Sequence, residues 1–351
     1  MRAIVIREHG GPEVLRLEEL PDPEPGPGQV RVRVAAVALN HLDLWGRRGL
    51  PHLKLRFPFI LGSDIAGTVD RVGAGVEGVT PGEEVVLNPG VSCGRCRECL
   101  SGRDNLCRSY HILGETRDGG YAEYVVVPAA NLLPAPRGIG WAERAAIPLV
   151  FLTAWQMLTR KAAVQPGEVV LIHAVGSGVG SAALQIAKMH GAMVIATAST
   201  EEKLAQARAF GADHTILSAG SGSAEDASER LLTKVREVTG KRGVDVVLEQ
   251  TGAATWGTSI RAAARGGRIV TCGATSGFDA HTDLRHVFFR QLQILGSTMG
   301  PKGDLFTILG HVEAGRLRPV LDRMYPLEVA SQAHQRLEQR SQFGKIVLRV
   351  S

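Results

Sequence analysis

One segment near the middle of the chain restricts the fold more than any other, because a strand leads through a glycine turn into a helix. Val169–Ile172 is a continuous apolar run, as expected for a strand that is buried on both faces of a parallel sheet. A helix is expected over Ser181–His190 and a second strand over Met193–Ala196. This order predicts a βαβ unit. The turn between the first strand and the helix contains Gly176, Ser177, Gly178, Val179 and Gly180.

The residues around this unit continue the same alternation. We expect helices over Leu149–Leu158 and Glu201–Phe210, the second ended by Gly211, and a polar surface loop over Ser218–Ser228. Apolar runs predict three more buried strands. Alternating strands and helices are typical of an α/β fold with a doubly wound parallel sheet. The three strands are Val244–Leu248, Gly267–Cys272 and Gln293–Ser297.

The first third of the chain instead predicts a β-rich domain. Val30, Val32 and Val34 alternate with arginines, which indicates a half-buried strand. Tyr121–Val127 is expected to be another strand, and Lys345–Val350 to be a last one near the end of the chain. A length of 351 residues agrees with about two domains.

Composition narrows the class of protein. The chain has 42 Gly but only 5% aromatic residues, which suits an α/β enzyme better than a β-sandwich. No apolar run reaches the ~18 residues of a membrane helix, and Met1–Ile6 is too short for a signal peptide, so we expect a cytoplasmic protein that binds no membrane. The net charge of +5 is spread along the chain, which argues against a nucleic-acid partner and suits an anionic small molecule.

The glycine turn predicts a dinucleotide site. The free N–H groups at the start of a helix attract a pyrophosphate, and glycines let the backbone approach it. The spacing departs from the usual G-x-G-x-x-G, so the prediction depends on the surrounding strand, helix and strand. The alternative is a turn that only packs the helix on the sheet.

The end of the second strand bears on the choice of nucleotide. NAD-binding chains carry an acid there for the ribose hydroxyl, but Thr197-Ala198 is followed by Ser199, Thr200 and Lys203, which can accept a 2′-phosphate. NADP(H) is therefore favoured over NAD(H). Two observations weaken this: Ser199 with Glu202 can instead form a helix capping box, and Glu201 and Glu202 would repel a phosphate.

Four of the five cysteines lie close together, as Cys93, Cys96, Cys99 and Cys107. Four thiolates with the spacing C-x2-C-x2-C-x7-C can surround one tetrahedral zinc ion, and such a closed site is structural rather than catalytic. An iron–sulfur cluster is the rival interpretation. Cys272, in an apolar run, is expected to be a small buried hydrophobic residue.

Together these features resemble the medium-chain dehydrogenase/reductase superfamily over essentially the whole chain. The cysteine lobe is similar to that of zinc-type alcohol dehydrogenases. Gly62–Gly67, Leu152–Trp155 and Ser177–Gly180 look like the quinone oxidoreductase branch. The resemblance implies a GroES-like catalytic domain over residues 1–149 and 299–351, with a Rossmann dinucleotide-binding domain over 150–298. It also implies a homo-oligomer, either a dimer or a tetramer.

The resemblance breaks at the catalytic zinc. Where the family has its Cys, His and Cys ligands, this chain has Asn40, Ser63 and approximately Leu149. Leu42 replaces the proton-relay hydroxyl of that branch, and Trp45 its downstream histidine. A substitute metal site made of His41, Asp43 and Asp64 is a weaker alternative, because Asp43 can instead hydrogen-bond the loop at Ser63.

Without that zinc, the predicted reaction is NAD(P)H-dependent reduction of a quinone or an α,β-unsaturated carbonyl. Hydrogen bonds can stabilise the negative charge that spreads onto the oxygen of such an acceptor. Asn40 is the candidate donor and Asp43 would orient it, although Asn40 can equally be a loop cap. Weaker candidates near the pocket are Arg47, Tyr110 and His111.

The resemblance also implies contacts with the cofactor. It places Thr153 against the nicotinamide ring and Gly296-Ser297-Thr298 near the carboxamide of that ring. Thr251 and Gly273 complete the expected contacts, and Thr153 can instead be a helix hydroxyl bonded to its own backbone. Two other functions stay open: an alcohol dehydrogenase acting on alcohols or aldehydes, and a non-catalytic NADPH-binding protein.

Overall fold

The chain forms two compact units, and the computed structural model describes residues 1–50, 54–218 and 223–350. One unit contains Met1–Leu152 and Pro301–Ser351, and the other contains Thr153–Gly300. We call them unit 1 and unit 2. The boundaries expected from the sequence, after residues 149 and 298, lie within three residues of these.

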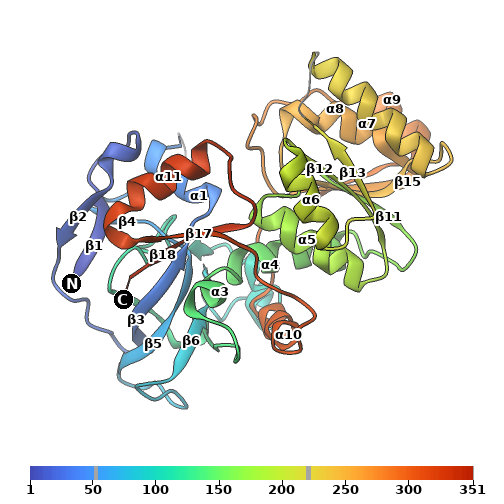
Figure 1. The fold of residues 1–351 in the computed structure, drawn as a ribbon. Coiled ribbons are helices and arrows are strands. Elements are labelled where there is room, and N and C mark those ends of the chain that lie inside the picture. Colours follow the sequence, from blue (N-terminus) through green and yellow to red (C-terminus); the bar gives the residue numbers. More distant parts are fainter. Residues whose placement is uncertain (51–53, 219–222, 351) are drawn as a thin grey trace. The chain divides into compact units, whose positions relative to one another are not determined.

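Unit 2 is built around a six-stranded sheet in which every neighbouring pair is parallel (Figure 1). The strand order is β13-β12-β11-β14-β15-β16. Numbered from the first strand of the unit, this is 3-2-1-4-5-6, the order of the doubly wound dinucleotide-binding sheet. The predicted α/β Rossmann architecture is therefore confirmed. The strands are β11 Val169–Ile172, β12 Met193–Ala198, β13 His214–Leu217, β14 Val244–Glu249, β15 Ala263–Thr271 and β16 Gln293–Gly296.

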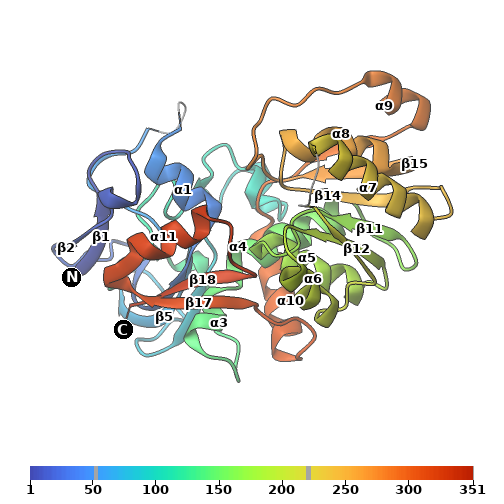
Figure 2. The ribbon, with the colours of Figure 1, turned by 45° about the horizontal axis from the view of Figure 1, so that its top comes forward.

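Helices cover both faces of this sheet (Figures 1 and 2). Helices α5 and α6 pack beside β11, β12 and β13, whereas α8 packs on β14 and β15 with α7 against it. The α7 and α8 side chains Leu231, Val235 and Ile260 share a core with Leu171 and Ile195 of the sheet. The helices are α5 Gly178–Met189, α6 Glu201–Ala209, α7 Ala224–Val238, α8 Ala253–Ala262 and α9 Leu284–Arg290.

Several expected boundaries in this half of the chain were wrong. Helix α5 begins at Gly178 rather than Ser181, because Ser177 accepts the Gly180 N–H and caps the helix earlier. The expected loop over Ser218–Ser228 becomes helix α7 from Ala224, since Ser223 caps that helix through the Asp226 N–H. Residues 219–222 of that loop lie outside the described residues.

The helix expected over Leu149–Leu158 divides into two parts. Helix α4 spans Pro148–Trp155, and the next residues, Gln156–Lys161, wind into a π-helical segment, η4. Short π segments inside helices occur often at functional sites. The Thr159 hydroxyl donates to the Trp155 carbonyl (2.7 Å), which satisfies one acceptor where the regular hydrogen-bond pattern changes.

Unit 1 is β-rich, and its main sheet contains strands from both ends of the chain. The order is β10-β6-β5-β3-β18-β17, with β9 also paired to β3. Smaller sheets have the orders β2-β1-β4 and β7-β8. The strands are β1 Arg2–Ile6, β2 Arg16–Glu19, β3 Gln29–Ala38, β4 Phe59–Ile60, β5 Asp64–Val72, β6 Glu84–Leu87, β7 Gly90–Val91, β8 His111–Ile112, β9 Tyr124–Pro128, β10 Leu132–Pro134, β17 Leu321–Pro326 and β18 Lys345–Arg349.

Strand β18 completes this unit by pairing antiparallel with β3, with Val347 opposite Ala38 and Leu348 opposite Val37. It lies between β3 and the edge strand β17, and its Leu348 is fully buried. The predicted return of the last strand is therefore confirmed, and it carries Lys345 into the interior of the unit. Strand β9 begins at Tyr124, three residues later than expected.

Short helices surround this sheet. They are α1 His41–Arg48, α2 Arg97–Leu100, α3 Trp141–Ala145, α10 Lys302–Glu313 and α11 Ala330–Glu338. Helix α1 follows β3 directly, so its first turn lies at the end of a central strand. Among the described residues, none of the helices combines the length and the apolar character needed to span a membrane.

Candidate functional site

The residues that we expected to bind the cofactor gather at one edge of the unit 2 sheet. They follow the ends of β11, β12, β14, β15 and β16, and because these strands are parallel, their carboxyl ends share that edge. Ligands of doubly wound sheets bind outside the carboxyl ends of the strands, where the strand order reverses. Here the order reverses between β11 and β14. The residues are Gly176–Gly180, Ser199, Thr200, Lys203, Thr251, Gly273 and Ser297.

The glycine turn allows a close approach to the start of α5. A Cβ atom on Gly180 would lie 2.7 Å from the Ala174 carbonyl oxygen, so only glycine fits there. The Ser177 hydroxyl already accepts the Gly180 N–H at 3.0 Å. The N–H groups of Gly178 and Val179 belong to the first turn of a helix, where the helix itself offers no acceptor. These two groups are available for a phosphate.

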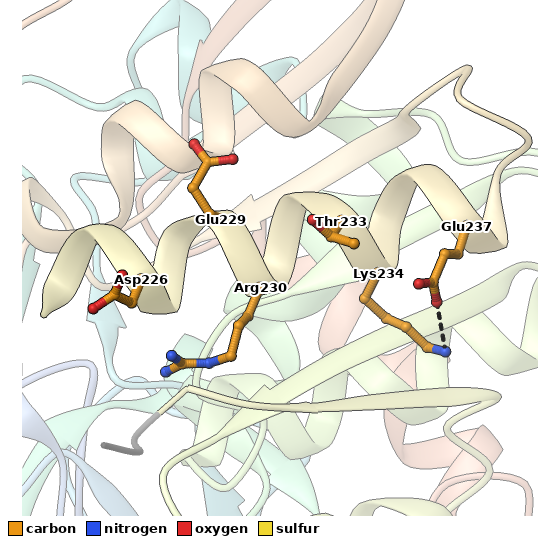
Figure 3. Close-up of a pocket in the computed structure, with 6 residues that line it drawn as sticks. All are labelled: Asp226, Glu229, Arg230, Thr233, Lys234 and Glu237. Atoms are coloured by element: carbon orange, nitrogen blue, oxygen red, sulfur yellow. Dashed lines mark hydrogen bonds and ion pairs between the residues drawn. The ribbon is translucent and has the colours of Figure 1, made fainter. Parts of the chain in front are cut away.

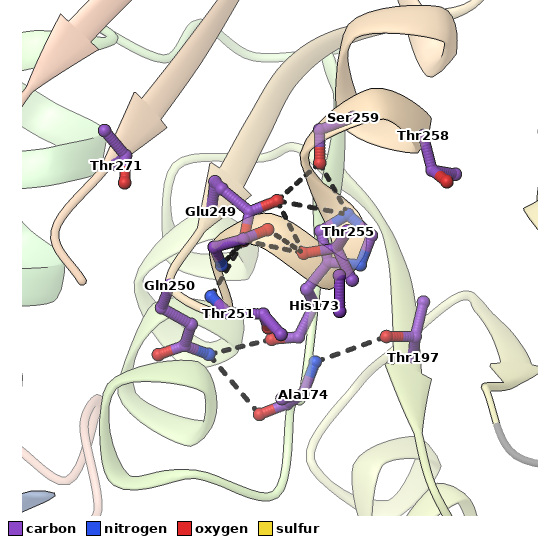
Figure 4. Close-up of polar contacts among 12 residues, drawn as sticks. His173, Ala174, Thr197, Glu249, Gln250, Thr251, Thr255, Thr258, Ser259 and Thr271 are labelled. Atoms are coloured by element: carbon purple, nitrogen blue, oxygen red, sulfur yellow. Dashed lines mark hydrogen bonds and ion pairs between the residues drawn. The ribbon is translucent and has the colours of Figure 1, made fainter. Parts of the chain in front are cut away.

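A buried carboxylate stabilises the backbone next to this turn through hydrogen bonds. Glu249, at the end of β14, is fully buried and accepts hydrogen bonds from the N–H groups of Thr251 (2.7 Å) and Gly252 (3.0 Å) and from the Ser259 hydroxyl (2.6 Å) (Figure 4). The Thr255 hydroxyl also contacts it. These bonds compensate for the loss of water around the charge.

The same network fixes His173 at the end of β11. Its Nε2 lies 2.9 Å from the Ser259 hydroxyl oxygen. Because that hydroxyl donates to Glu249, its oxygen accepts from His173, which places the imidazole proton on Nε2. Burial lowers the pKa of His173, so the ring is neutral. The Gln250 amide donates to the His173 carbonyl (2.7 Å) and more weakly to that of Ala174 (3.4 Å), so the ends of β11 and β14 are joined (Figure 4).

Ala174 begins the turn with φ of +47°, in the left-handed region that a residue with a side chain rarely adopts. Its N–H donates to the Thr197 hydroxyl (3.2 Å), and its carbonyl accepts the Ser177 N–H (2.9 Å). Such strain persists only where the surrounding structure holds it, and it concentrates at functional sites.

The residues after β12 include the hydroxyls and the lysine noted in the sequence, but the residue that caps the next helix differs from the expected one. Thr200, rather than Ser199, caps α6, because the Thr200 hydroxyl accepts the Lys203 N–H at 3.3 Å. Ser199 is therefore not the capping residue, and its exposed hydroxyl remains available to a ligand. Glu201 and Glu202 are exposed in the first turn of α6.

Three further residues lie at the same edge of unit 2. Gly273 follows β15, and the Thr251 carbonyl accepts the Ser276 N–H and hydroxyl, both at 2.7 Å. The Ser297 hydroxyl is buried and has no hydrogen-bond partner among the described residues. An orphaned hydroxyl is costly to bury, so a polar ligand group there would be favoured. The donors, the glycine cradle and this hydroxyl fit a dinucleotide.

In unit 1, Asn40 and Asp43 form the first turn of α1. The Asp43 carboxylate accepts the Asn40 backbone N–H (2.7 Å) and the Gly62 N–H (3.0 Å). The loop bond expected for Asp43 is therefore present, at Gly62 instead of Ser63. Asp43 orients the backbone of Asn40 rather than its side chain.

A second carboxylate and a lysine hold the Asn40 side chain. The Asn40 amide nitrogen donates to Asp64 Oδ2 (3.0 Å), and the Lys345 ammonium donates to Asn40 Oδ1 (2.6 Å) and to Asp64 Oδ2 (2.8 Å). The other Asp64 oxygen accepts the Leu149 N–H at 2.7 Å. Asp64 is completely buried and the Lys345 side chain is 4% exposed.

These residues do not fit a catalytic zinc. The Asn40 oxygen already binds an ammonium, Ser63 offers a hydroxyl and Leu149 offers no ligand atom, whereas zinc prefers thiolate, imidazole and carboxylate. The substitute site of His41, Asp43 and Asp64 gains no support from the geometry. The His41 ring packs against Trp45, and within residues 1–50, 54–218 and 223–350 only the four-cysteine lobe groups three or more such ligands.

A chain of buried polar side chains connects Asp43 to the surface of unit 1. The Tyr121 hydroxyl contacts Asp43 and lies 3.1 Å from His334 Nε2. Arg47 donates to His334 Nδ1 (3.2 Å) and pairs with Glu338. Because Arg47 only donates, His334 Nδ1 is the acceptor and its Nε2 carries the proton.

Burial shifts the pKa values of three side chains in this series in the direction that favours their neutral forms. Burial raises the pKa of Asp43 to about 7, against the lowering effect of the Asn40 N–H and Lys345. It raises the pKa of Tyr121 well above its usual value and lowers that of His334 to about 3. Arg47, a weaker candidate for the pocket, is fully buried in this chain and acts as a structural cation.

The other candidates from the sequence have contacts of their own. His111 Nδ1 contacts the Thr116 hydroxyl at 3.2 Å. Tyr110 packs over Gly90, where an added Cβ would lie 1.9 Å from its hydroxyl oxygen, and burial raises the pKa of Tyr110. Thr153 is buried on α4 and is the first residue of unit 2. Burial raises the pKa of Cys272 to about 12, which opposes a nucleophilic role.

The four lobe cysteines gather around one point. Their sulfur atoms all lie within 4.8 Å of one another, with Cys96 and Cys99 at 3.5 Å and Cys93 and Cys99 at 3.9 Å. A tetrahedron with Zn–S bonds of 2.3 Å has sulfur–sulfur edges of about 3.8 Å. Backbone N–H groups of Arg95 and Cys96 lower the pKa of Cys93 to about 6, which favours the thiolate. The set fits one structural zinc ion.

A hollow on α7 offers no comparable chemistry. Its lining side chains come from a single helix, and Lys234 pairs with Glu237 at 3.1 Å (Figure 3). Mixed charges on one exposed helix face are typical of a solvated surface.

Sequence reasoning missed Lys345, His334, Glu249 and His173. A signal was available for Lys345 and Glu249, which lie at the ends of strongly apolar strands. A charged residue in a buried strand needs a partner. The histidines carried no comparable signal.

Family models match both halves of the chain. Residues 26–137 match the alcohol dehydrogenase GroES-like domain, and residues 178–314 match the zinc-binding dehydrogenase model.

Individual proteins match the chain over most of its length. An NAD-dependent alcohol dehydrogenase of Saccharolobus solfataricus is 32% identical, with 99% of each chain covered. A crotonyl-CoA reductase of Streptomyces avermitilis is 32% identical over 88% of this chain and 72% of its own, and a quinone oxidoreductase of Sus scrofa is 29% identical over 99% and 100%. A solved structure titled as an NAD-dependent alcohol dehydrogenase is 54% identical, covers all of both chains and has a TM-score of 0.94.

The geometry of the lobe predicts one zinc ion per chain. Substitution of Cys93 or Cys107 by Ser should abolish its binding, because three sulfurs no longer close the tetrahedron. Native mass spectrometry after dialysis measures the metal. Cys272→Ser is the control and should retain the zinc; iron in the purified protein would contradict the assignment.

The buried Asp43 predicts a pH-dependent stability. Its pKa of about 7 in the folded chain exceeds the ~4 of an unfolded aspartate, so the folded chain keeps this proton up to a higher pH. The stability of the wild type relative to Asp43→Asn should therefore fall as the pH rises from about 4 to about 7, and then stay constant.

Thermal unfolding of both proteins between pH 4 and pH 8 measures this difference. Asp283→Asn is the control: Arg285 lowers the pKa of Asp283 to about 2, so its effect should be constant above about pH 5 and should not decrease as the pH rises. A constant difference for Asp43→Asn would contradict the prediction.

Proposed function

Because the chain belongs to the medium-chain dehydrogenase/reductase superfamily, whose relatives here are NAD(P)-dependent oxidoreductases, we propose that it reduces quinones or α,β-unsaturated carbonyls with NAD(P)H and without a catalytic metal. The observation that carries this proposal is the buried cluster of Asn40, Asp64 and Lys345. Asn40 stands at the position of a metal ligand in the zinc-type branch. The relatives named crotonyl-CoA reductase and quinone oxidoreductase also support it.

The nicotinamide ring of the bound cofactor would supply the hydride, and the residues of unit 2 would hold it. The N–H groups of Gly178 and Val179 bind the pyrophosphate in this proposal, and the strained turn at Ala174 keeps them in place. Thr153 contacts the ring, and the orphaned Ser297 hydroxyl binds its carboxamide.

The residues of unit 1 would stabilise the acceptor. Hydride adds to the conjugated carbon, the electron pair moves onto the carbonyl oxygen, and Asn40 donates an N–H to that oxygen. A proton from water then completes the saturated carbonyl, or the hydroquinone when the acceptor is a quinone. A conjugated acceptor suits this site because its charge is delocalised, whereas an alkoxide needs a Lewis acid or a proton relay.

An alcohol dehydrogenase is the second candidate. The 54% identical structure and the Saccharolobus solfataricus relative both carry that name. The donor set around Asn40 opposes it, since an amide bound to an ammonium is a poor zinc ligand. The third alternative, a non-catalytic NADPH-binding protein, loses support because the relatives that cover the chain are named for enzymatic activities.

NADP(H) is the preferred cofactor in this proposal. The end of β12 carries Ser199 and Thr200 instead of a carboxylate, and Lys203 follows one turn later. Glu201 and Glu202 would weaken the preference. All five cysteines are unpaired thiols, which suits the reducing cytoplasm that we propose as the location of the protein.

A panel of acceptors tests the proposal. Zinc-loaded protein is assayed by nucleotide absorbance with NADPH and NADH against a quinone, an enone and crotonyl-CoA, and with NADP⁺ and NAD⁺ against ethanol and benzyl alcohol. We expect reduction of conjugated acceptors, a higher kcat/KM for NADPH than for NADH, and no loss of activity with 1,10-phenanthroline. Alcohol oxidation that the chelator abolishes would refute the metal-free proposal.

We also propose that unit 2 assembles with a second copy of the chain. Strand β16 is the edge of its sheet, and an edge strand presents unpaired N–H and C=O groups. Large apolar side chains are exposed beside it in the sequence: Leu284 is 68% exposed, Phe289 66% and Phe278 93%. An edge can pair with its own copy across a two-fold axis, which makes a self-complementary interface.

Light scattering coupled to size-exclusion chromatography measures this assembly. Phe289→Glu should lower the mass toward that of the 37.4 kDa monomer, because it places a charge in the apolar surface. Phe306→Glu is the matched control, since Phe306 is 57% exposed but lies on α10 of unit 1. A monomeric wild type would contradict the proposal.

A further inference from the structure

The most unusual charged residue in unit 1 is Lys345. Lysine is almost never fully buried unless it is paired, yet this side chain is 4% exposed at the start of strand β18, which has a neighbouring strand on both sides. Its ammonium makes two short hydrogen bonds, to Asn40 and Asp64, and these are its only hydrogen-bond partners among the described residues.

The chemistry of these partners determines which way the Asn40 amide faces. An ammonium only donates hydrogen bonds and a carboxylate only accepts them. The oxygen of the amide must therefore face Lys345 (2.6 Å), and its nitrogen must face Asp64 (3.0 Å). The ammonium and the carboxylate therefore favour the same orientation of the amide, and each holds one end of it.

One N–H of Asn40 stays weakly held in this arrangement. The first donates to Asp64, and within the described part of the chain the second has only the Ala38 carbonyl, at 3.4 Å, a long hydrogen bond. A carbonyl oxygen of higher charge could replace that weak partner at little cost. The arrangement therefore leaves the amide one donor to offer.

Lys345 also balances the charge of Asp64. Its ammonium lies 2.8 Å from the carboxylate, so the buried pair carries no net charge next to Asn40. Removal of the ammonium alone would leave a buried negative charge 3.0 Å from the amide nitrogen. The amide oxygen would at the same time lose its donor, so the Asn40 side chain would no longer be held at both ends.

We propose that Lys345 is a positioning residue of the active site: it fixes the Asn40 carboxamide with its N–H toward the acceptor and neutralises Asp64 beneath it. This inference rests on the proposed function, because it gives Asn40 the role of donor to the acceptor oxygen. Lys345 acts through Asn40 and does not itself touch the acceptor.

Steady-state kinetics with the best conjugated acceptor test this role. Lys345→Met should lower kcat at least tenfold and leave the KM for NADPH within about twofold, because the cofactor residues lie in unit 2. Lys345→Arg retains a charged donor and should recover part of the lost kcat. If Lys345→Met does not fold, the same kinetics are measured on Lys345→Met combined with Asp64→Asn, which removes both buried charges.

A double-mutant cycle with Asn40→Ala separates positioning from a direct effect. If Lys345 acts through Asn40, Lys345→Met should change kcat by less than about threefold in the Asn40→Ala background. Arg31→Met is the matched control: Arg31 is also 4% exposed and pairs with Asp70 at 2.6 Å in unit 1. It should lower the melting temperature and leave kcat unchanged.

The outcomes distinguish this inference from the proposed function. A wild type that reduces no conjugated acceptor refutes both. A wild type that reduces them, with an unchanged kcat in folded Lys345→Met, refutes the inference alone. Equal losses from Lys345→Met in the presence and absence of Asn40 would show a direct role and also overturn it.

Discussion

The buried polar cluster of unit 1 depends on the hydrogen bonds that the Asp64 carboxylate accepts. This carboxylate binds the Leu149 N–H with one oxygen, and Asn40 and Lys345 with the other. These partners come from three distant parts of the chain, and each contributes a hydrogen-bond donor. A fully buried charge is tolerated only when it is paired and hydrogen-bonded, so loss of any one donor leaves a cost that the others cannot offset.

A second buried carboxylate has the corresponding role in unit 2. Glu249 accepts hydrogen bonds from the start of the β14–α8 connection and, through Ser259, fixes His173 below the glycine turn. The turn itself is strained at Ala174. The polar network therefore holds the backbone donors of α5 in a conformation that the local sequence would not hold alone, which is how a preorganised anion site is obtained.

The two kinds of metal site in this superfamily have separate requirements, and the chain illustrates the difference. The lobe keeps four sulfur ligands within 4.8 Å, a set that suits a closed structural zinc. Around Asn40 the same fold places an amide, a hydroxyl and an aliphatic side chain where ligands would stand, with an internal ammonium among them. A shared fold thus leaves the chemistry to a few positions, and our proposal of a conjugated acceptor depends on these.

The sequence by itself determined the features that depend on neighbours along the chain. Apolar runs gave five of the six strands of the parallel sheet, with Val169–Ile172 correct to the residue, but β13 was missed. The cysteine spacing indicated the lobe. Helix ends were less accurate, because caps such as Ser177 and Thr200 compete with similar residues nearby.

Only the tertiary structure decided the partners of the buried charges. Lys345 and Asn40 are 305 residues apart, and Lys345 and Asp64 are 281 apart, so no local periodicity relates them. They meet because β18 pairs with β3, which ends just before Asn40. Sequence patterns encode which face of an element is buried, but the partner across the core follows from strand order and register, which are properties of the whole chain.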